Sequence, residues 1–93
     1  MVKSATKLIV HGTVQGVFFR QFVKDNADKL GLRGFVRNMD DKSVEVILEG
    51  DREPIERMTE LVRKGPEHSM IKNVDSQERK WSGEFKDFKI LRF

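Results

Sequence analysis

The segment TKLIVHGTVQGVFFRQFVKDNADKLG, residues 6–31, carries the clearest structural signals of this 93-residue chain. Its first part, residues 6–13, is a short apolar run closed by Gly12, which is typical of a β-strand. After residue 18 the apolar residues recur at intervals of three and four, which predicts one apolar face of a helix that ends at Gly31. These apolar residues are Phe19, Phe22, Val23, Ala27 and Leu30.

Two further strands and a turn are predicted after this helix. The first strand covers residues 34–39, and the second covers residues 43–49, where Val44, Val46 and Leu48 share one face. The residues between the two strands are polar, as is usual in a turn. The two strands are therefore predicted to form a β-hairpin.

A second amphipathic helix is predicted beyond the hairpin. Asp51 can cap its N-terminus, Pro54 is tolerated in its first turn, and the Gly65-Pro66 pair ends it. The apolar residues between 71 and 90 then predict one long or two short antiparallel strands around Ser82 and Gly83.

The resulting order, strand, helix, strand, strand, helix, strand, is that of the split βαβ arrangement. We therefore predict a ferredoxin-like α/β sandwich of the α+β class, with two helices on one face of an antiparallel sheet. Because a chain of 93 residues can bury one core, residues 1–93 are predicted to form a single domain. The helix residues expected to pack against the sheet are Phe19, Phe22, Met58 and Leu61.

The composition excludes several kinds of site. Without cysteine the chain has no disulfides, thiolate nucleophiles or sulfur-ligated metal. The net charge of +3 comes from basic residues scattered among acidic ones, so a nucleic-acid surface is not indicated, although a pI of 9.4 favours an anionic ligand. No apolar stretch suffices for a membrane span or a signal peptide, and no large unpaired apolar surface is predicted. We expect a cytoplasmic monomer without membrane contact.

The loop from the first strand to the first helix, residues 12–20, is the candidate anion site. Glycines allow successive backbone N–H groups to point inward, and the start of a helix favours negative charge. Arg20 would be unfavourable at that end of the helix dipole unless an anion compensates it. Its guanidinium can contact two phosphate oxygens at once. Asn38, taken alone, is more typical of a turn residue than of a catalytic one.

Two motifs resemble those of the acylphosphatase family. The family pattern GxVQGVxFR matches residues 12–20, and the pattern GxVxN, followed by a turn and SVE, matches residues 34–45. The pair EG at 49–50 and the triplet KGP at 64–66 also lie where the family usually has them. The resemblance covers essentially the entire chain.

The resemblance implies a hydrolase that cleaves acyl phosphates to a carboxylate and inorganic phosphate, without a metal or an organic cofactor. The implied catalytic residues are Arg20, which binds the phosphoryl group, and Asn38, which orients the attacking water. Inorganic phosphate is then expected as a product inhibitor. The residues implied in phosphate binding, through backbone N–H groups and the arginine side chain, are Gln15, Gly16, Val17, Phe18, Phe19 and Arg20.

The sequence departs from the family pattern in the turn after Asn38. Many members have a glycine where this chain has Lys42, so a turn that required a positive φ would strain Lys42 and could shift Asn38. Two neighbouring carboxylates in this turn, Asp40 and Asp41, are expected to be solvated. Phe18, at a variable loop position, is expected to border the mouth of the substrate site.

We compare this interpretation with three alternatives: a histidine-based metal site or nucleophilic dyad, an RNA-recognition module, and a regulatory domain. His11 and His68 lack the neighbouring carboxylate or cysteine pattern of a metal site or nucleophilic dyad. RNA-recognition modules share the element order, but the predicted first and third strands offer no aromatic stacking platform. A regulatory acylphosphatase-like domain, such as those attached to larger carbamoyl-transfer proteins, is the third. The presence of both Arg20 and Asn38 favours an active enzyme.

Overall fold

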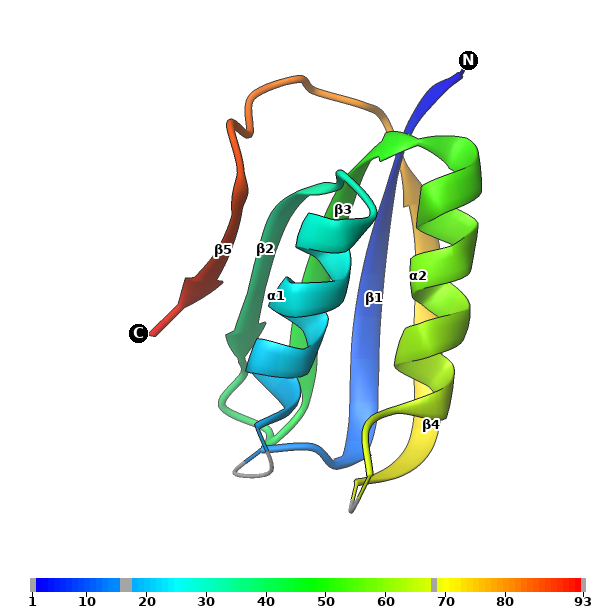
Figure 1. Ribbon diagram of the computed structural model, residues 1–93. Helices are drawn as coiled ribbons and strands as arrows, with labels where there is room; N and C mark the ends of the chain where they lie inside the picture. Colours follow the sequence, from blue (N-terminus) through cyan, green and yellow to red (C-terminus); the bar gives the residue numbers. More distant parts are fainter. Residues whose placement is uncertain (1, 16–17, 68, 93) are drawn as a thin grey trace.

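Two helices cover one face of a five-stranded sheet in the part of the chain that the structure describes (Figure 1). The structure is a computed structural model and describes residues 2–15, 18–67 and 69–92. The elements, in chain order, are β1 (Lys3–Thr13), α1 (Phe19–Lys29), β2 (Arg33–Asn38), β3 (Val44–Asp51), α2 (Arg52–Lys64), β4 (Met70–Arg79) and β5 (Phe88–Leu91). None of these helices is long and apolar enough to cross a membrane.

The strands lie in the order β4-β1-β3-β2-β5 across the sheet. β1 pairs antiparallel with both β3 and β4, and β2 pairs antiparallel with β3. These four strands and two helices form the predicted ferredoxin-like fold. The sheet is mixed rather than wholly antiparallel, because β5 pairs parallel to β2 at the edge.

The end of the chain corrects the expectation of antiparallel strands around Ser82 and Gly83. β4 and β5 lie at opposite edges of the sheet, and the segment between them crosses its upper end (Figure 1). Two burial requirements explain this path. Phe88 enters the core at the free edge of β2 with only 2% exposed. The buried carboxylate of Glu49 accepts hydrogen bonds from Ser82 N (3.0 Å), Ser82 Oγ (2.8 Å) and Gly83 N (3.0 Å), which satisfy its charge.

The core lies between the helices and the sheet. Phe19 and Met58 are fully buried there, and Phe22 and Leu61 pack against its margin, which confirms the predicted packing residues. Each fully buried side chain of this size stabilises the fold by about 1.5–3 kcal/mol. The β3 residues of the predicted apolar face, Val44, Val46 and Leu48, are all buried in the same core.

The helix ends follow the sequence signals with one exception. Gly31 (φ 70°) follows α1 and Gly65 (φ 73°) follows α2, as predicted. Asp51 occupies the N-cap position of α2, but among the described residues its side chain makes no capping hydrogen bond. One of its oxygens instead lies 3.2 Å from the ammonium of Lys3, its partner across β1 and β3. This ion pair, rather than a capping hydrogen bond, is the contact that the described residues give to the carboxylate.

Candidate active site

The loop β1–α1 and the turn β2–β3 meet at one end of the sheet, at the bottom of Figure 1. β1 and β2 are both antiparallel to β3, so they run in the same direction and their C-terminal ends lie at the same end of the sheet. The topology therefore brings Arg20 and Asn38, which are eighteen positions apart in sequence, to one end of the molecule.

Gln15 connects the loop to the turn. Its side-chain Nε2 donates to the backbone carbonyl oxygen of Met39 at 3.2 Å and to that of Ser43 at 3.0 Å. Sequence reasoning assigned Gln15 only a backbone role in phosphate binding and missed these contacts. No sequence signal marks them, because their acceptors are backbone atoms that become neighbours through the fold.

Asn38 is the last residue of β2 and lies opposite Val44 of β3. The side chain is partly buried, and its Oδ1 is buried without a hydrogen-bond partner among the described residues. A buried acceptor without a partner is unfavourable by about 1–3 kcal/mol, so such an atom marks a place where a ligand or water can bind. This geometry makes Asn38 more than an ordinary turn residue.

Arg20 stands in the first turn of α1 and is partly buried. Its Nη1 donates to the carbonyl oxygen of Leu91 at 3.3 Å, and no carboxylate pairs with it among residues 2–15, 18–67 and 69–92. The first turn of α1 contains no acidic residue. The positive end of the helix dipole and the guanidinium therefore add up at one place, which favours an anion.

Phe18 precedes α1 in a left-handed backbone conformation, with φ 60° and ψ 24°. That conformation is unfavourable for a residue other than glycine by about 1–2 kcal/mol, and the ring is 87% exposed. Phe18, Arg20, Ile90 and Arg92 are among the residues that line a hollow of about 420 Å³. The predicted binding residues Gly16 and Val17 lie outside the described residues.

The turn after Asn38 does require a positive φ at the position where many family members have glycine and this chain has Lys42. Lys42 has φ 76°, and the turn is closed by hydrogen bonds from Met39 N to Ser43 O (2.9 Å) and from Lys42 N to Met39 O (3.2 Å). The pairing of Asn38 with Val44 is nevertheless retained. Lys42 therefore carries the strain, and Asn38 pairs in register with β3.

Asp41 was expected only to be solvated, but its carboxylate also organises this turn. Its Oδ1 accepts from Ser43 N at 3.0 Å and from Ser43 Oγ at 2.5 Å. The hydrogen bond from the Ser43 side chain, followed by that from its backbone, lowers the pKa of Asp41 below its ordinary value. The ionised carboxylate thus helps to hold the strained turn in place.

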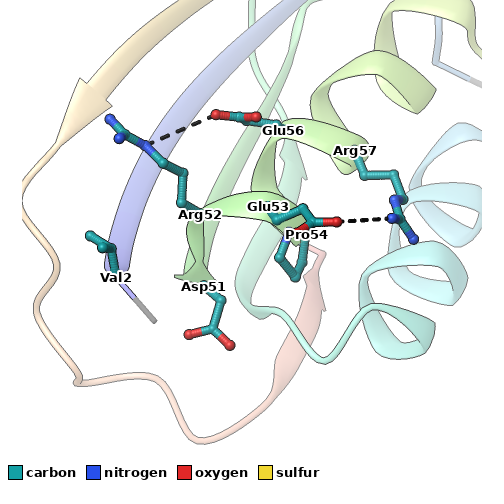
Figure 2. A pocket seen from close by; sticks show the side chains of 7 residues that line it. All are labelled: Val2, Asp51, Arg52, Glu53, Pro54, Glu56 and Arg57. Atoms are coloured by element: carbon teal, nitrogen blue, oxygen red, sulfur yellow. Dashed lines mark hydrogen bonds and ion pairs between the residues drawn. The ribbon is translucent and has the colours of Figure 1, made fainter.

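A larger hollow, of about 770 Å³, lies at the start of α2 and has different chemistry (Figure 2). Its two arginines pair with glutamates of the same helix, Arg57 with Glu53 at 3.2 Å and Arg52 with Glu56 at 4.0 Å. A hollow whose cations are paired with neighbouring carboxylates attracts an anion less than one beside an arginine that has no carboxylate partner among the described residues. We therefore place the candidate site at α1.

The histidine-site and RNA-module alternatives gain no support in the described residues. His11 Nε2 lies 3.3 Å from an oxygen of Asp75 on the surface, and His68 lies outside the described part. Among the described residues, no three or more His, Cys, Asp or Glu side chains gather as metal ligands do. On the face of the sheet away from the helices, Phe35 packs edge-on against Phe85, with ring centroids 5.9 Å apart.

Known proteins resemble this chain over nearly its whole length. A family model described as Acylphosphatase matches residues 6–90. An acylphosphatase of Pyrobaculum aerophilum is 42% identical over 92 residues, which are 98% of this chain and 97% of that protein. The crystal structure of acylphosphatase from Bacillus subtilis superposes with a TM-score of 0.91 at 35% identity and covers 96% of this chain and 99% of its own.

A longer protein also contains this fold. Full-length HypF, solved in a phosphate- and nucleotide-bound form, matches 98% of this chain with a TM-score of 0.85 and 31% identity, but the match covers only 12% of HypF. The fold therefore occurs both alone and within larger chains. On the extent of the family match and the identity to curated relatives, this chain belongs to the acylphosphatase family.

Proposed function

We propose that this chain hydrolyses acyl phosphates to a carboxylate and inorganic phosphate at the end of the sheet that carries Arg20 and Asn38. The observation that carries the proposal is the convergence there of a helix N-terminus, a guanidinium and a buried amide oxygen without a described partner. Membership of the acylphosphatase family supports it. The same observations favour catalysis over a binding-only role, because phosphate binding alone would not require Asn38.

In the proposed complex the loop of residues 15–20 holds the phosphoryl group. Arg20 binds two of its oxygens, and backbone N–H groups of the loop bind the remaining charge. A charge-assisted hydrogen bond of this kind contributes about 1.5–3 kcal/mol. The inorganic phosphate released presents the same oxygens to the loop, so it is proposed to act as a competitive inhibitor.

Asn38 is proposed to orient the attacking water. Its Oδ1 accepts a hydrogen bond from that water, while its amide NH₂ donates to a phosphoryl oxygen. The water oxygen attacks phosphorus in line with the leaving group, the P–O bond to the acyl group breaks, and the electron pair leaves with the carboxylate. A phosphoryl oxygen accepts the proton of the water. A carboxylate leaves readily, so positioning and charge stabilisation suffice without a metal or an acid catalyst.

The acyl group is proposed to lie in the hollow beside Arg20. The exposed ring of Phe18 and the side chain of Ile90 offer apolar surface there, and Arg92 borders the same hollow. Because one copy of the chain supplies all these groups, we propose that it acts as a monomer. We also propose that it works in the cytoplasm.

The first test is hydrolysis of benzoyl phosphate by the purified protein in the presence of EDTA, with inorganic phosphate as competitor. The proposal predicts turnover that EDTA does not affect and that phosphate inhibits competitively. Binding of phosphate without turnover would support the regulatory-domain interpretation instead. Absence of both would contradict the placement of the anion site at α1.

A further inference from the structure

The side-chain amide of Gln15 links the two halves of the proposed site. Both of its acceptors lie in the hairpin that carries Asn38, since Met39 follows Asn38 and Ser43 precedes its cross-strand partner Val44. Among the side-chain hydrogen bonds of the described residues, these two are the ones that join the β1–α1 loop to the β2–β3 turn. They span 24 and 28 positions of sequence.

The turn needs such a link because its own geometry is strained. Lys42 holds a left-handed backbone, and the carbonyl oxygen of Ser43 already closes the turn by accepting from Met39 N at 2.9 Å. Gln15 Nε2 also donates to this oxygen and to that of Met39, so it is bonded to both sides of the turn next to Asn38. Fixing the turn there limits how far Asn38 can move relative to the loop.

The amide of Gln15 is not available to the phosphoryl group. A carboxamide nitrogen has two hydrogens, and the two carbonyl oxygens of Met39 and Ser43 account for both. Both neighbours are acceptors, which also fixes the orientation of the amide, with nitrogen rather than oxygen toward the turn. The side chain of Gln15 therefore acts on the reaction through the position of other groups.

We propose that Gln15 is a positioning residue, whose side chain sets the distance between the phosphate loop and the water-orienting amide of Asn38. This inference rests on the proposed function. In-line attack requires the water to lie near 3 Å from phosphorus in the correct direction, and a displacement of about 1 Å can lower the rate about 100-fold. A side chain that fixes this distance affects turnover more than it affects phosphate binding.

The test begins with Gln15→Leu, which keeps the approximate size of the side chain and removes both donors. We expect kcat for benzoyl phosphate to fall about 10-fold or more, while the inhibition constant of inorganic phosphate changes less than about 3-fold. Gln77→Leu is the matched control, because Gln77 is exposed on β4 and far from the site in the fold. It is expected to retain the kcat of the wild type. Loss of phosphate binding in parallel with kcat would overturn the inference.

A double-mutant cycle with Asn38→Ala then separates positioning from general support. If Gln15 acts through Asn38, Gln15→Leu lowers kcat in the wild type but changes it less than about 2-fold when Asn38 is already alanine. The same fold-loss in both backgrounds would contradict the inference. Circular dichroism and thermal unfolding of all four proteins verify that each is folded at the assay temperature, and Gln15→Ala repeats the cycle with a smaller side chain.

The failure of this inference differs from the failure of the proposed function. If the wild type hydrolyses benzoyl phosphate and the cycle is additive, only the role of Gln15 is wrong. If the wild type has no turnover, the proposed function is wrong, and the role of Gln15 falls with it.

Discussion

The two strand-to-helix junctions occupy equivalent places in the two βαβ halves of the fold but are built differently. At β3–α2, Asp51 leads directly into Arg52, and the arginines of the first helical turns pair with glutamates of the same helix (Figure 2). At β1–α1, residues 14–18 separate strand from helix, and Arg20 meets a backbone carbonyl rather than a carboxylate among its described contacts.

We propose that the α2 junction is structural and that the α1 junction binds a ligand. The α2 junction satisfies its charges internally, so it offers no net attraction to an anion. The α1 junction keeps a left-handed Phe18 and an arginine in the same place as the positive end of the helix. We propose that the positive charge binds the phosphoryl group and that the backbone strain is retained because this junction is functional.

The largest expected effect separates the two junctions by their arginines. Arg20→Gln should lower kcat/KM for benzoyl phosphate about 1000-fold and weaken phosphate binding, because it removes charge-assisted contacts to the transition state. Arg52→Gln removes a matched cation at the start of α2 and should change kcat/KM less than about 2-fold, since its ion pairs are exposed. Steady-state kinetics on both variants measures this, and equal losses would contradict the distinction.

A second substitution sharpens the division of roles at the α1 end. Asn38→Ala should lower kcat about 100-fold, as expected for loss of an oriented catalytic group, while phosphate binding stays within about 3-fold of the wild type. Asn73→Ala is the control, because Asn73 bonds only to exposed Asp75 among its described side-chain contacts. Titration calorimetry with phosphate, together with kcat, tests the prediction. A loss of phosphate affinity as large as that of Arg20→Gln would refute separate roles.

The stored strain at α1 predicts opposite stability changes at the two N-caps. Phe18→Gly should raise the free energy of unfolding by about 0.5–1 kcal/mol, because glycine accepts the left-handed backbone and the exposed ring loses little packing. Asp51→Gly should lower it by a similar amount, since φ at Asp51 is −73° and the ion pair with Lys3 is lost. Urea denaturation of both variants checks the signs. Changes of the same sign would mean that Phe18 is not strained.

The smallest expected effects concern pH. The stability that Asp41 contributes to the turn should depend on pH at low pH, whereas the rate of catalysis should not depend on pH near neutrality. The pKa of Asp41 is lowered in the folded protein by Ser43, so its stabilising contribution is complete above the ordinary pKa of 3.8 and is lost as pH falls through the lowered value. The free energies of unfolding of the wild type and of Asp41→Asn, measured by urea denaturation, should therefore converge at low pH. Catalysis should vary little between about pH 5 and 8, because the proposed mechanism uses no side chain as an acid or base. A bell-shaped rate profile centred on a histidine pKa would implicate His11 or His68 instead.

The parts of the fold that follow from local patterns were predictable from the sequence. The apolar face of α1, the apolar face of β3 that enters the core and the glycines after both helices each depend on near neighbours, and the structure agrees with all of them. The two motifs also indicated which loop and which turn would form the candidate site. Their convergence follows from the common direction of β1 and β2.

The features that escaped prediction depend on partners far away in sequence. The parallel pairing of β5 depends on the free edge of β2 and on the burial of Phe88. The carboxylate of Asp51 pairs with Lys3, which is far away in sequence, and makes no capping hydrogen bond among the described residues. The side chain of Gln15 donates hydrogen bonds to backbone oxygens, whose positions cannot be predicted from residue types.

The most direct test of the account is the fate of the oxygen of water. Benzoyl phosphate should be hydrolysed by the wild type in ¹⁸O-enriched water with EDTA present, and both products should be analysed by mass spectrometry. Attack on phosphorus, as the placement of Arg20 and Asn38 predicts, puts the label in inorganic phosphate and none in benzoate. Label in benzoate would show attack at the acyl carbon and would contradict the proposed roles of both residues.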